Sequence, residues 1–171
     1  EYYTVYYKVG SGEWTTTAPS VTNVEDGEVT VSVKATRTGY EDLTAEDVKI
    51  KINARPVTIT VDSKEKYFGT EDPTFTGSIT SGSLVATNDL GTITYSRTNT
   101  AEAVGPYEGV LTASYTENKN YSVTVVLGNF EIKTASIAGA SLSATGGSWT
   151  YDGKAHSASA SVTGAEYYTV Y

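Results

Sequence analysis

Apolar and polar residues alternate along most of the chain, and this period of two predicts β-strands. In residues 28–36 every second position is apolar, from Val29 to Ala35, and the positions between them are polar or charged. The same alternation recurs in residues 57–61 and 121–127. Gly, Asn, Asp and Pro interrupt these runs, which is where turns are expected. Because each strand has one apolar and one polar face, the pattern predicts an all-β fold of antiparallel sheets with almost no helix.

The spacing of the runs predicts small modules rather than one large domain. Residues 54–133 contain about seven short runs, beginning with Val57, Ile59 and Val61 on an inward face, which is the scale of a small β-sandwich. A short run of Asn, Ala, Arg and Pro before residue 57 reads as a linker. A chain of 171 residues with 39 % apolar residues suits two small cores better than a single large one.

The two ends of the chain carry the same six residues, since residues 166–171 repeat residues 1–6. A fixed period, here 165 residues, is typical of a repeat array. We therefore interpret residues 1–53 as the C-terminal part of one module and residues 134–171 as the N-terminal part of the next. In a string of modules these parts emerge from opposite ends of residues 54–133. We expect a neighbouring copy to complete each part, in the same polypeptide or by strand donation between chains.

The turns and strand starts carry a motif that resembles the MBG family of bacterial Ig-like repeats. In the central module the resemblance rests on Lys66-Tyr67-Phe68-Gly69-Thr70-Glu71-Asp72-Pro73, Val104-Gly105-Pro106-Tyr107, Asn120-Tyr121 and Phe130-Glu131-Ile132. In the divided module it rests on Thr150-Tyr151-Asp152-Gly153 and Gly39-Tyr40. The resemblance implies Ig-like antiparallel β-sandwich modules in an elongated, beads-on-a-string array. It also implies a bacterial cell-surface location, because such repeats occur in large surface proteins that include mucus-associated adhesins, and it supplies no catalytic residue.

Composition narrows the possible partners. The formal charge of −8 and the scattered Lys and Arg residues argue against nucleic acid, which needs clustered positive charge. No apolar run reaches the roughly 18 residues that would span a bilayer, so we expect no membrane insertion in this segment. The absence of Cys and Met suits an extracellular protein.

Catalytic chemistry has little basis in the sequence, and we expect neither an enzyme nor a cofactor. The one histidine, His156, falls in a run that predicts a strand, where a packed or edge imidazole is expected. Acidic pairs such as Glu25-Asp26 and Glu71-Asp72 are adjacent, so on a strand their side chains would diverge. Turn chemistry explains them. Calcium bound at a junction and an isopeptide from a buried Lys remain open alternatives.

Two functions follow from this reading. The first is a non-catalytic structural repeat of a bacterial extracellular filament or adhesin stalk, whose units join head to tail. The second is a multivalent adhesin that binds host glycans or mucin weakly in each copy. Tyr2 and Tyr6 are the candidate glycan contacts, because they point away from the face that holds Tyr3, Val5 and Tyr7, and aromatic rings stack on sugars.

Overall fold

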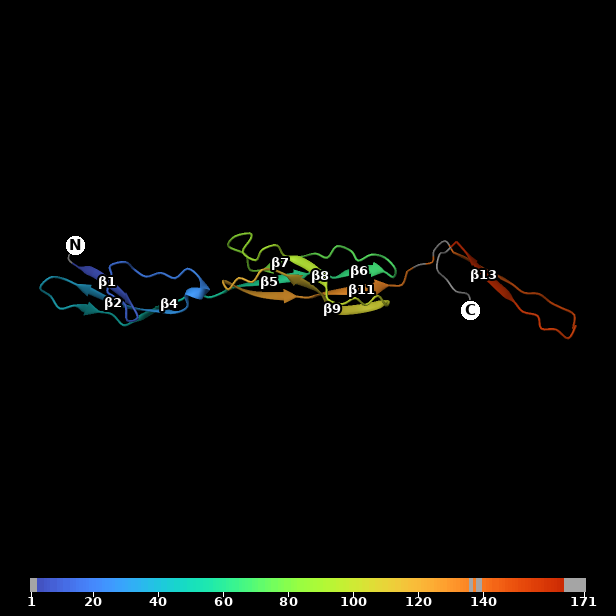
Figure 1. The fold of residues 1–171 in the computed structure, drawn as a ribbon, viewed down its shortest axis with the longest axis horizontal. Helices are drawn as coiled ribbons and strands as arrows, with labels where there is room; N and C mark the ends of the chain where they lie inside the picture. Colours follow the sequence, from blue (N-terminus) through green and yellow to red (C-terminus); the bar gives the residue numbers. More distant parts are fainter. Residues whose placement is uncertain (1–2, 136, 138–139, 165–171) are drawn as a thin grey trace.

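The computed structural model describes residues 3–135, 137 and 140–164, and these form strands with a single 3₁₀ turn, η1 (Val24–Asp26). The all-β prediction is therefore confirmed. Figure 1 shows three parts in a row, with the chain's first and last strands at opposite ends of the middle part, as expected.

The three parts are named here by their strands. The N-terminal sheet contains β1 (Thr4–Val9), β2 (Val29–Thr36), β3 (Leu43–Thr44) and β4 (Val48–Ile50). The central module contains β5 (Arg55–Val61), β6 (Lys64–Tyr67), β7 (Gly77–Ser81), β8 (Thr94–Arg97), β9 (Gly105–Ser114), β10 (Tyr121–Val126) and β11 (Gly128–Lys133). The C-terminal hairpin contains β12 (Ser141–Thr145) and β13 (Ser159–Thr163).

The central module holds two sheets that share one apolar core. One sheet has the order β10-β5-β7 and the other β6-β11-β9-β8. Val57, Ile59 and Val61 of β5 are buried, which confirms the inward face predicted from their alternation. They pack with core residues from both sheets, among them Leu111 of β9 and Phe130 of β11. The alternating pattern thus gives each sheet one face for the core and one for water.

The chain changes sheets at two neighbouring places, where β5 leads into β6 and where β10 leads into β11. β5 runs parallel to β10 in the first sheet, and β6 runs parallel to β11 in the second, so the prediction of antiparallel sheets is wrong for these two pairs. Alternation of apolar and polar residues does not by itself fix the direction of a neighbouring strand. At the crossing Gly128 lies so close to the backbone that an added Cβ would be 2.8 Å from the carbonyl oxygens of Val61 and Asp62. The Asn129 N–H donates to the Ser63 hydroxyl at 2.9 Å. Only glycine fits this crossing.

Leu127 differs from its predicted inward position. It is 49 % exposed, although Tyr121, Val123 and Val125 before it face the core as expected. The alternation fails here because Leu127 lies between β10 and β11, where the strand leaves one sheet for the other.

The N-terminal sheet is open on its apolar side. β2 pairs with β1, β3 and β4, and among the described residues of this sheet Val31 is the one buried apolar side chain. β1 pairs with β2 along its whole length. In addition, Tyr7 and Thr15 exchange two backbone hydrogen bonds, of 2.7 and 2.8 Å, and form a single bridge.

Among the described residues, the C-terminal hairpin is a sheet of two strands. β12 and β13 pair antiparallel, with Leu142 opposite Val162, and nearly every residue in both strands is exposed. His156 lies before β13 and outside any strand, so the predicted strand position was wrong. Its ring stacks on Trp149 at 4.6 Å between centroids. A two-stranded sheet without a covering layer is marginal in water.

The crossing predicts a specific sensitivity to Gly128→Ala. The new methyl group would contact two backbone oxygens that cannot move without disturbing both sheets. We expect a loss of about 1–3 kcal/mol in the free energy of unfolding, measured by urea denaturation with far-UV circular dichroism.

Gly146→Ala is the matched control, because nothing lies within 4 Å of its added Cβ. Equal stability of the Gly128→Ala and Gly146→Ala variants would contradict the close approach at the crossing.

Candidate functional site

The sequence candidates for catalysis are held in local structural contacts. His156 Nε2 lies 3.1 Å from Asp152 Oδ1, and its ring stacks on Trp149, so its partners are a turn carboxylate and an indole. The backbone N–H of Lys154, and then His156, lower the pKa of Asp152. Neither partner is a Ser, Thr or Cys side chain that the imidazole could activate, and both contacts lie within the loop of the hairpin.

The acidic turns bind their own backbone. Asp26 Oδ2 accepts hydrogen bonds from the N–H groups of Asn23 at 2.8 Å and Thr22 at 2.6 Å, which lower the pKa of Asp26. Asp89 accepts a short hydrogen bond from the Tyr121 hydroxyl, which is the main cause of its lowered pKa. Throughout the part of the chain that the structure describes, no three His, Cys, Asp or Glu residues are arranged to hold a metal ion.

Four charged residues form a compact ion cluster beside the core of the central module. Lys66 Nζ lies 2.8 Å from Asp72 and also contacts Glu102, while Arg97 reaches Asp72 at 3.2 Å and Glu102 at 2.5 Å. The side chains of Lys66 and Arg97 are only 6 % and 8 % exposed. Two positive charges thus balance two negative ones. A buried charge needs this kind of pairing to remain ionised.

This cluster contains the buried lysine that an isopeptide bond would need. Asp72 and then Glu102 raise the pKa of Lys66, and Lys66 and then Arg97 lower the pKa of Glu102. Lys66 and Arg97 each contact both Asp72 and Glu102, so the four charges form one ion network.

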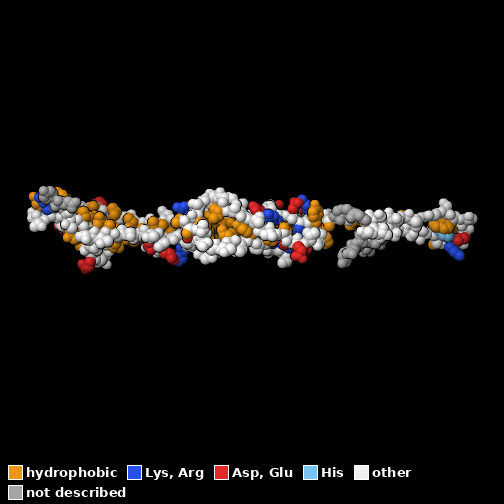
Figure 2. Space-filling view, turned by 90° about the horizontal axis from the view of Figure 1, so that it is seen from above, with side chains coloured by type: hydrophobic (Ala, Val, Ile, Leu, Met, Phe, Trp, Pro, Cys, Tyr) orange, Lys and Arg blue, Asp and Glu red, His pale blue; other side chains and the backbone are white. Residues whose placement is uncertain are grey.

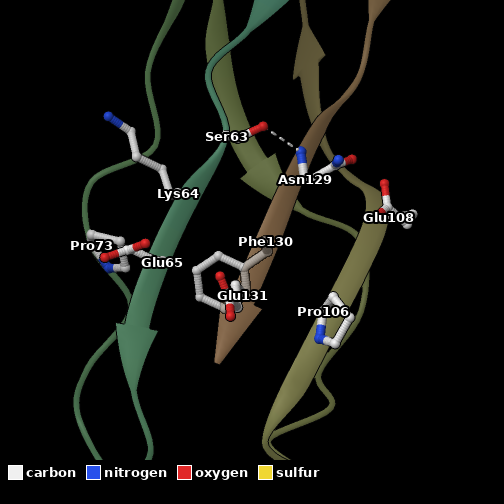
Figure 3. A pocket seen from close by; sticks show the side chains of 9 residues that line it. All are labelled: Ser63, Lys64, Glu65, Pro73, Pro106, Glu108, Asn129, Phe130 and Glu131. Atoms are coloured by element: carbon white, nitrogen blue, oxygen red, sulfur yellow. Dashed lines mark hydrogen bonds between the residues drawn. The ribbon is translucent and has the colours of Figure 1, made fainter. Parts of the chain in front are cut away.

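A surface hollow of about 530 Å³ lies where β6, β11 and β9 meet, as Figure 3 shows. Its lining consists of Ser63, Lys64, Glu65, Pro73, Pro106, Glu108, Asn129, Phe130 and Glu131. The Ser63 hydroxyl accepts the hydrogen bond from Asn129, and Glu65 pairs with Lys133 at 2.5 Å. The lining has three carboxylates and no His or Cys, so it contains no histidine-activated serine or cysteine.

The junction between the N-terminal sheet and the central module is organised by one amide. Asn120 Oδ1 accepts from the Val24 N–H, and Asn120 Nδ2 donates to Asn23 Oδ1, both at 2.8 Å. The backbone carbonyl of Asn120 accepts from the Arg55 N–H at 2.8 Å, where the linker enters β5. One residue thus binds the preceding part of the chain and the linker at once.

Other residues complete this junction. Lys119 pairs with Glu25 at 2.7 Å on its surface. A cleft of about 430 Å³ beside Asn120 is lined by residues of both parts, including Ile52 and Tyr121. The turn at Asn120 was recognised in the sequence, but its role was missed, because the contact with Asn23 spans 97 positions. No local pattern carries that information.

The apolar faces at both ends of the molecule are exposed. Leu43 is 65 % exposed in the N-terminal sheet, with Val5 and Val48 also exposed, and Leu142 is 70 % exposed in the C-terminal hairpin. Figure 2 shows hydrophobic side chains reaching the surface over the N-terminal part of the molecule. Such faces normally bind another layer of structure.

Of the two tyrosines predicted to contact glycans, Tyr2 lies outside the described residues. Tyr6 is half-buried on β1, with the Lys34 ammonium 5.9 Å from its ring centroid. Beside it, Lys8 and Lys34 each lie 5.0 Å from the Trp14 ring centroid. Lys34 thus lies near both the Tyr6 ring and the Trp14 ring, which sequence alternation alone did not reveal.

The described residues contain no helix that is long and apolar enough to cross a membrane. Comparison with family models matches residues 57–131 to the MBG domain (YGX type), a non-catalytic domain type associated with bacterial surface proteins. No curated protein and no solved structure matches the chain significantly.

The junction predicts that Asn120→Ala will uncouple the N-terminal sheet from the central module. The change removes two hydrogen bonds, each worth about 0.5–1.5 kcal/mol, and leaves the Val24 N–H without its acceptor. NMR relaxation should show one common tumbling time in the unchanged protein and a shorter one for the N-terminal sheet in the variant.

Lys119→Ala is the matched control, since an exposed ion pair contributes little. If Asn120→Ala tumbles like the unchanged protein, the amide does not hold the junction.

Proposed function

Because the central module is an MBG domain of the YGX type, we propose that the chain is a structural repeat of a bacterial extracellular surface filament or adhesin stalk. In this proposal the repeat is non-catalytic, and its units are Ig-like β-sandwiches joined head to tail. The neighbouring copies of the same repeat are its principal partners. Its work is to span distance and resist bending.

The observation that carries the proposal is an elongated row of parts whose ends are unfinished. The N-terminal sheet and the C-terminal hairpin lie at opposite ends of the central module, so they cannot cover each other within one chain (Figure 1). Each exposes apolar side chains that a second layer would bury. The six residues shared by both ends of the sequence fit the same arrangement, because they allow one copy to continue into the next.

The junction and the ion cluster suit a load-bearing spacer. Asn120 fixes the angle between the N-terminal sheet and the central module through its amide. The hollow of Figure 3 and the acidic turns offer structural contacts in place of a reactive group. These features support the proposal that the repeat acts as a stiff spacer.

Copies can be joined in two ways, and a denaturing gel distinguishes them. One continuous polypeptide would run as a very large species on a denaturing gel of the native filament. Strand donation between separate chains would instead give a band of the size of one separate chain.

A multivalent adhesin that binds host glycans or mucin is the second candidate. Tyr6 with Trp14, Lys8 and Lys34 favours it, because aromatic rings stack on sugars and ammonium groups donate hydrogen bonds to them. A glycan array separates the candidates: an adhesin binds glycans and loses binding in Tyr6→Ala, whereas a spacer binds none. Tyr151→Ala, at an exposed position in the C-terminal hairpin, is the control.

The head-to-tail proposal predicts a difference between a single chain and a tandem polypeptide of residues 1–165 followed by residues 1–171. In the tandem polypeptide the first hairpin can cover the second N-terminal sheet, while the last hairpin has no partner. Hydrogen exchange followed by mass spectrometry should therefore give two equal populations for β12–β13 peptides, one exchanging at least about tenfold more slowly.

The single chain should give one fast population, because the described residues of its hairpin form only two, largely exposed strands. One fast population in the tandem polypeptide as well would contradict head-to-tail completion.

A further inference from the structure

The N-terminal sheet repeats part of the central module strand for strand. β9 pairs antiparallel with β8 and β11, and β2 pairs in the same way with β1 and β4. Leu111 is paired with Gly128, and Val31 with Val48, and seventeen positions separate the members of both pairs. The sheet β1-β2-β4 is therefore the counterpart of β8-β9-β11.

The C-terminal hairpin repeats the strands that the N-terminal sheet lacks. β5 pairs antiparallel with β7 through Ile59 and Ile79, and β12 pairs antiparallel with β13 through Leu142 and Val162. Twenty positions separate the members of each pair. After the first strand of each pair comes a glycine with positive φ, 81° at Gly69 and 75° at Gly153. The hairpin is thus the counterpart of β5 and β7.

One segment of the N-terminal sheet departs from this correspondence. In the central module β10 pairs with β5 alone, with Val123 opposite Val57 and Val125 opposite Ile59. Gly128 corresponds to Val48, because they are the partners of Leu111 and Val31. Val123 and Val125 lie five and three positions before Gly128. Their counterparts, five and three positions before Val48, are therefore Leu43 and Ala45.

In this structure Leu43 pairs with Ala35 of β2, and the Ala45 N–H donates to the Val33 carbonyl at 3.1 Å. β10 makes no such pairing with β9. The segment 43–45 therefore pairs with a part of β2 whose counterpart on β9 has no strand beside it on that edge.

We propose that the segment 43–45 changes partner when copies join. This inference rests on the proposed head-to-tail function and specifies its register. β12 of the preceding copy takes the position of β5, and the segment leaves β2 to run parallel to β12, with Ala140 opposite Leu43 and Leu142 opposite Ala45. Leu43, now 65 % exposed, then faces a shared core, as its counterpart Val123 does.

The exposure at both ends gives the exchange its driving force. Leu43 and Leu142 lose their contact with water together, which the pairing with β2 does not achieve. The backbone hydrogen bonds lost with β2 are replaced by those to β12, so the number of paired groups is kept. The pairing of β3 with β2 is therefore the resting position of a segment whose partner strand comes from another copy.

The test is disulfide trapping, which is clean because the chain contains no cysteine. One variant carries Ala35→Cys and Leu43→Cys, in the single chain or in the second copy of the tandem polypeptide. The pair should form a disulfide readily in the single chain and about tenfold more slowly in the tandem polypeptide, because separated Cβ atoms cannot be bridged. A second tandem variant, with Ala140→Cys in the first copy and Leu43→Cys in the second, should form its disulfide.

Lys8→Cys with Ser32→Cys is the matched control, since these residues are paired on β1 and β2 and should react equally in both polypeptides. Replacing Leu43→Cys by Thr44→Cys in the second variant points the thiol to the other face and should slow the reaction about tenfold.

Two results would overturn the inference. If the tandem polypeptide shows its protected hairpin population but the pair at residues 35 and 43 reacts as fast as in the single chain, the exchange is wrong and the proposed function stands. If no hairpin population is protected, the proposed function fails, and the exchange fails with it.

Discussion

An apolar sheet face has to be covered, and this constraint governs the molecule from end to end. The central module meets it internally, because its two sheets bury one core between them. The N-terminal sheet and the C-terminal hairpin are built from the same alternating pattern, yet Leu43 and Leu142 are exposed. The same pattern that builds the core in the middle of the chain leaves apolar side chains exposed in the N-terminal sheet and the C-terminal hairpin.

Different contacts hold different parts of the molecule together. Gly128 permits two strand pairs to cross between sheets, which makes the central module a single body around Phe130. Asn120 then joins that body to the sheet before it. The buried ions at Lys66 and Arg97 are neutralised within their own cluster. A few specific contacts thus hold these parts of the chain together.

The sequence predicted what depends on period and composition. Alternation correctly placed Val57, Ile59 and Val61 in the core, and the turn glycines and Asp-Pro segment indicated the family. It failed where tertiary contacts decide the outcome. Leu127 turns outward at a sheet change, and His156 stacks on Trp149 outside any strand. The Asn120 contact and the Lys66 cluster join residues too distant in sequence for any periodic signal.

The most direct measurement is an atomic structure of two consecutive copies in one polypeptide. The account predicts a second two-sheet module between the two central modules, with Leu142 of the first copy and Val31 of the second in one buried core. A first hairpin that remains solvent-exposed on both faces, beside a second N-terminal sheet unchanged from the single chain, would contradict it.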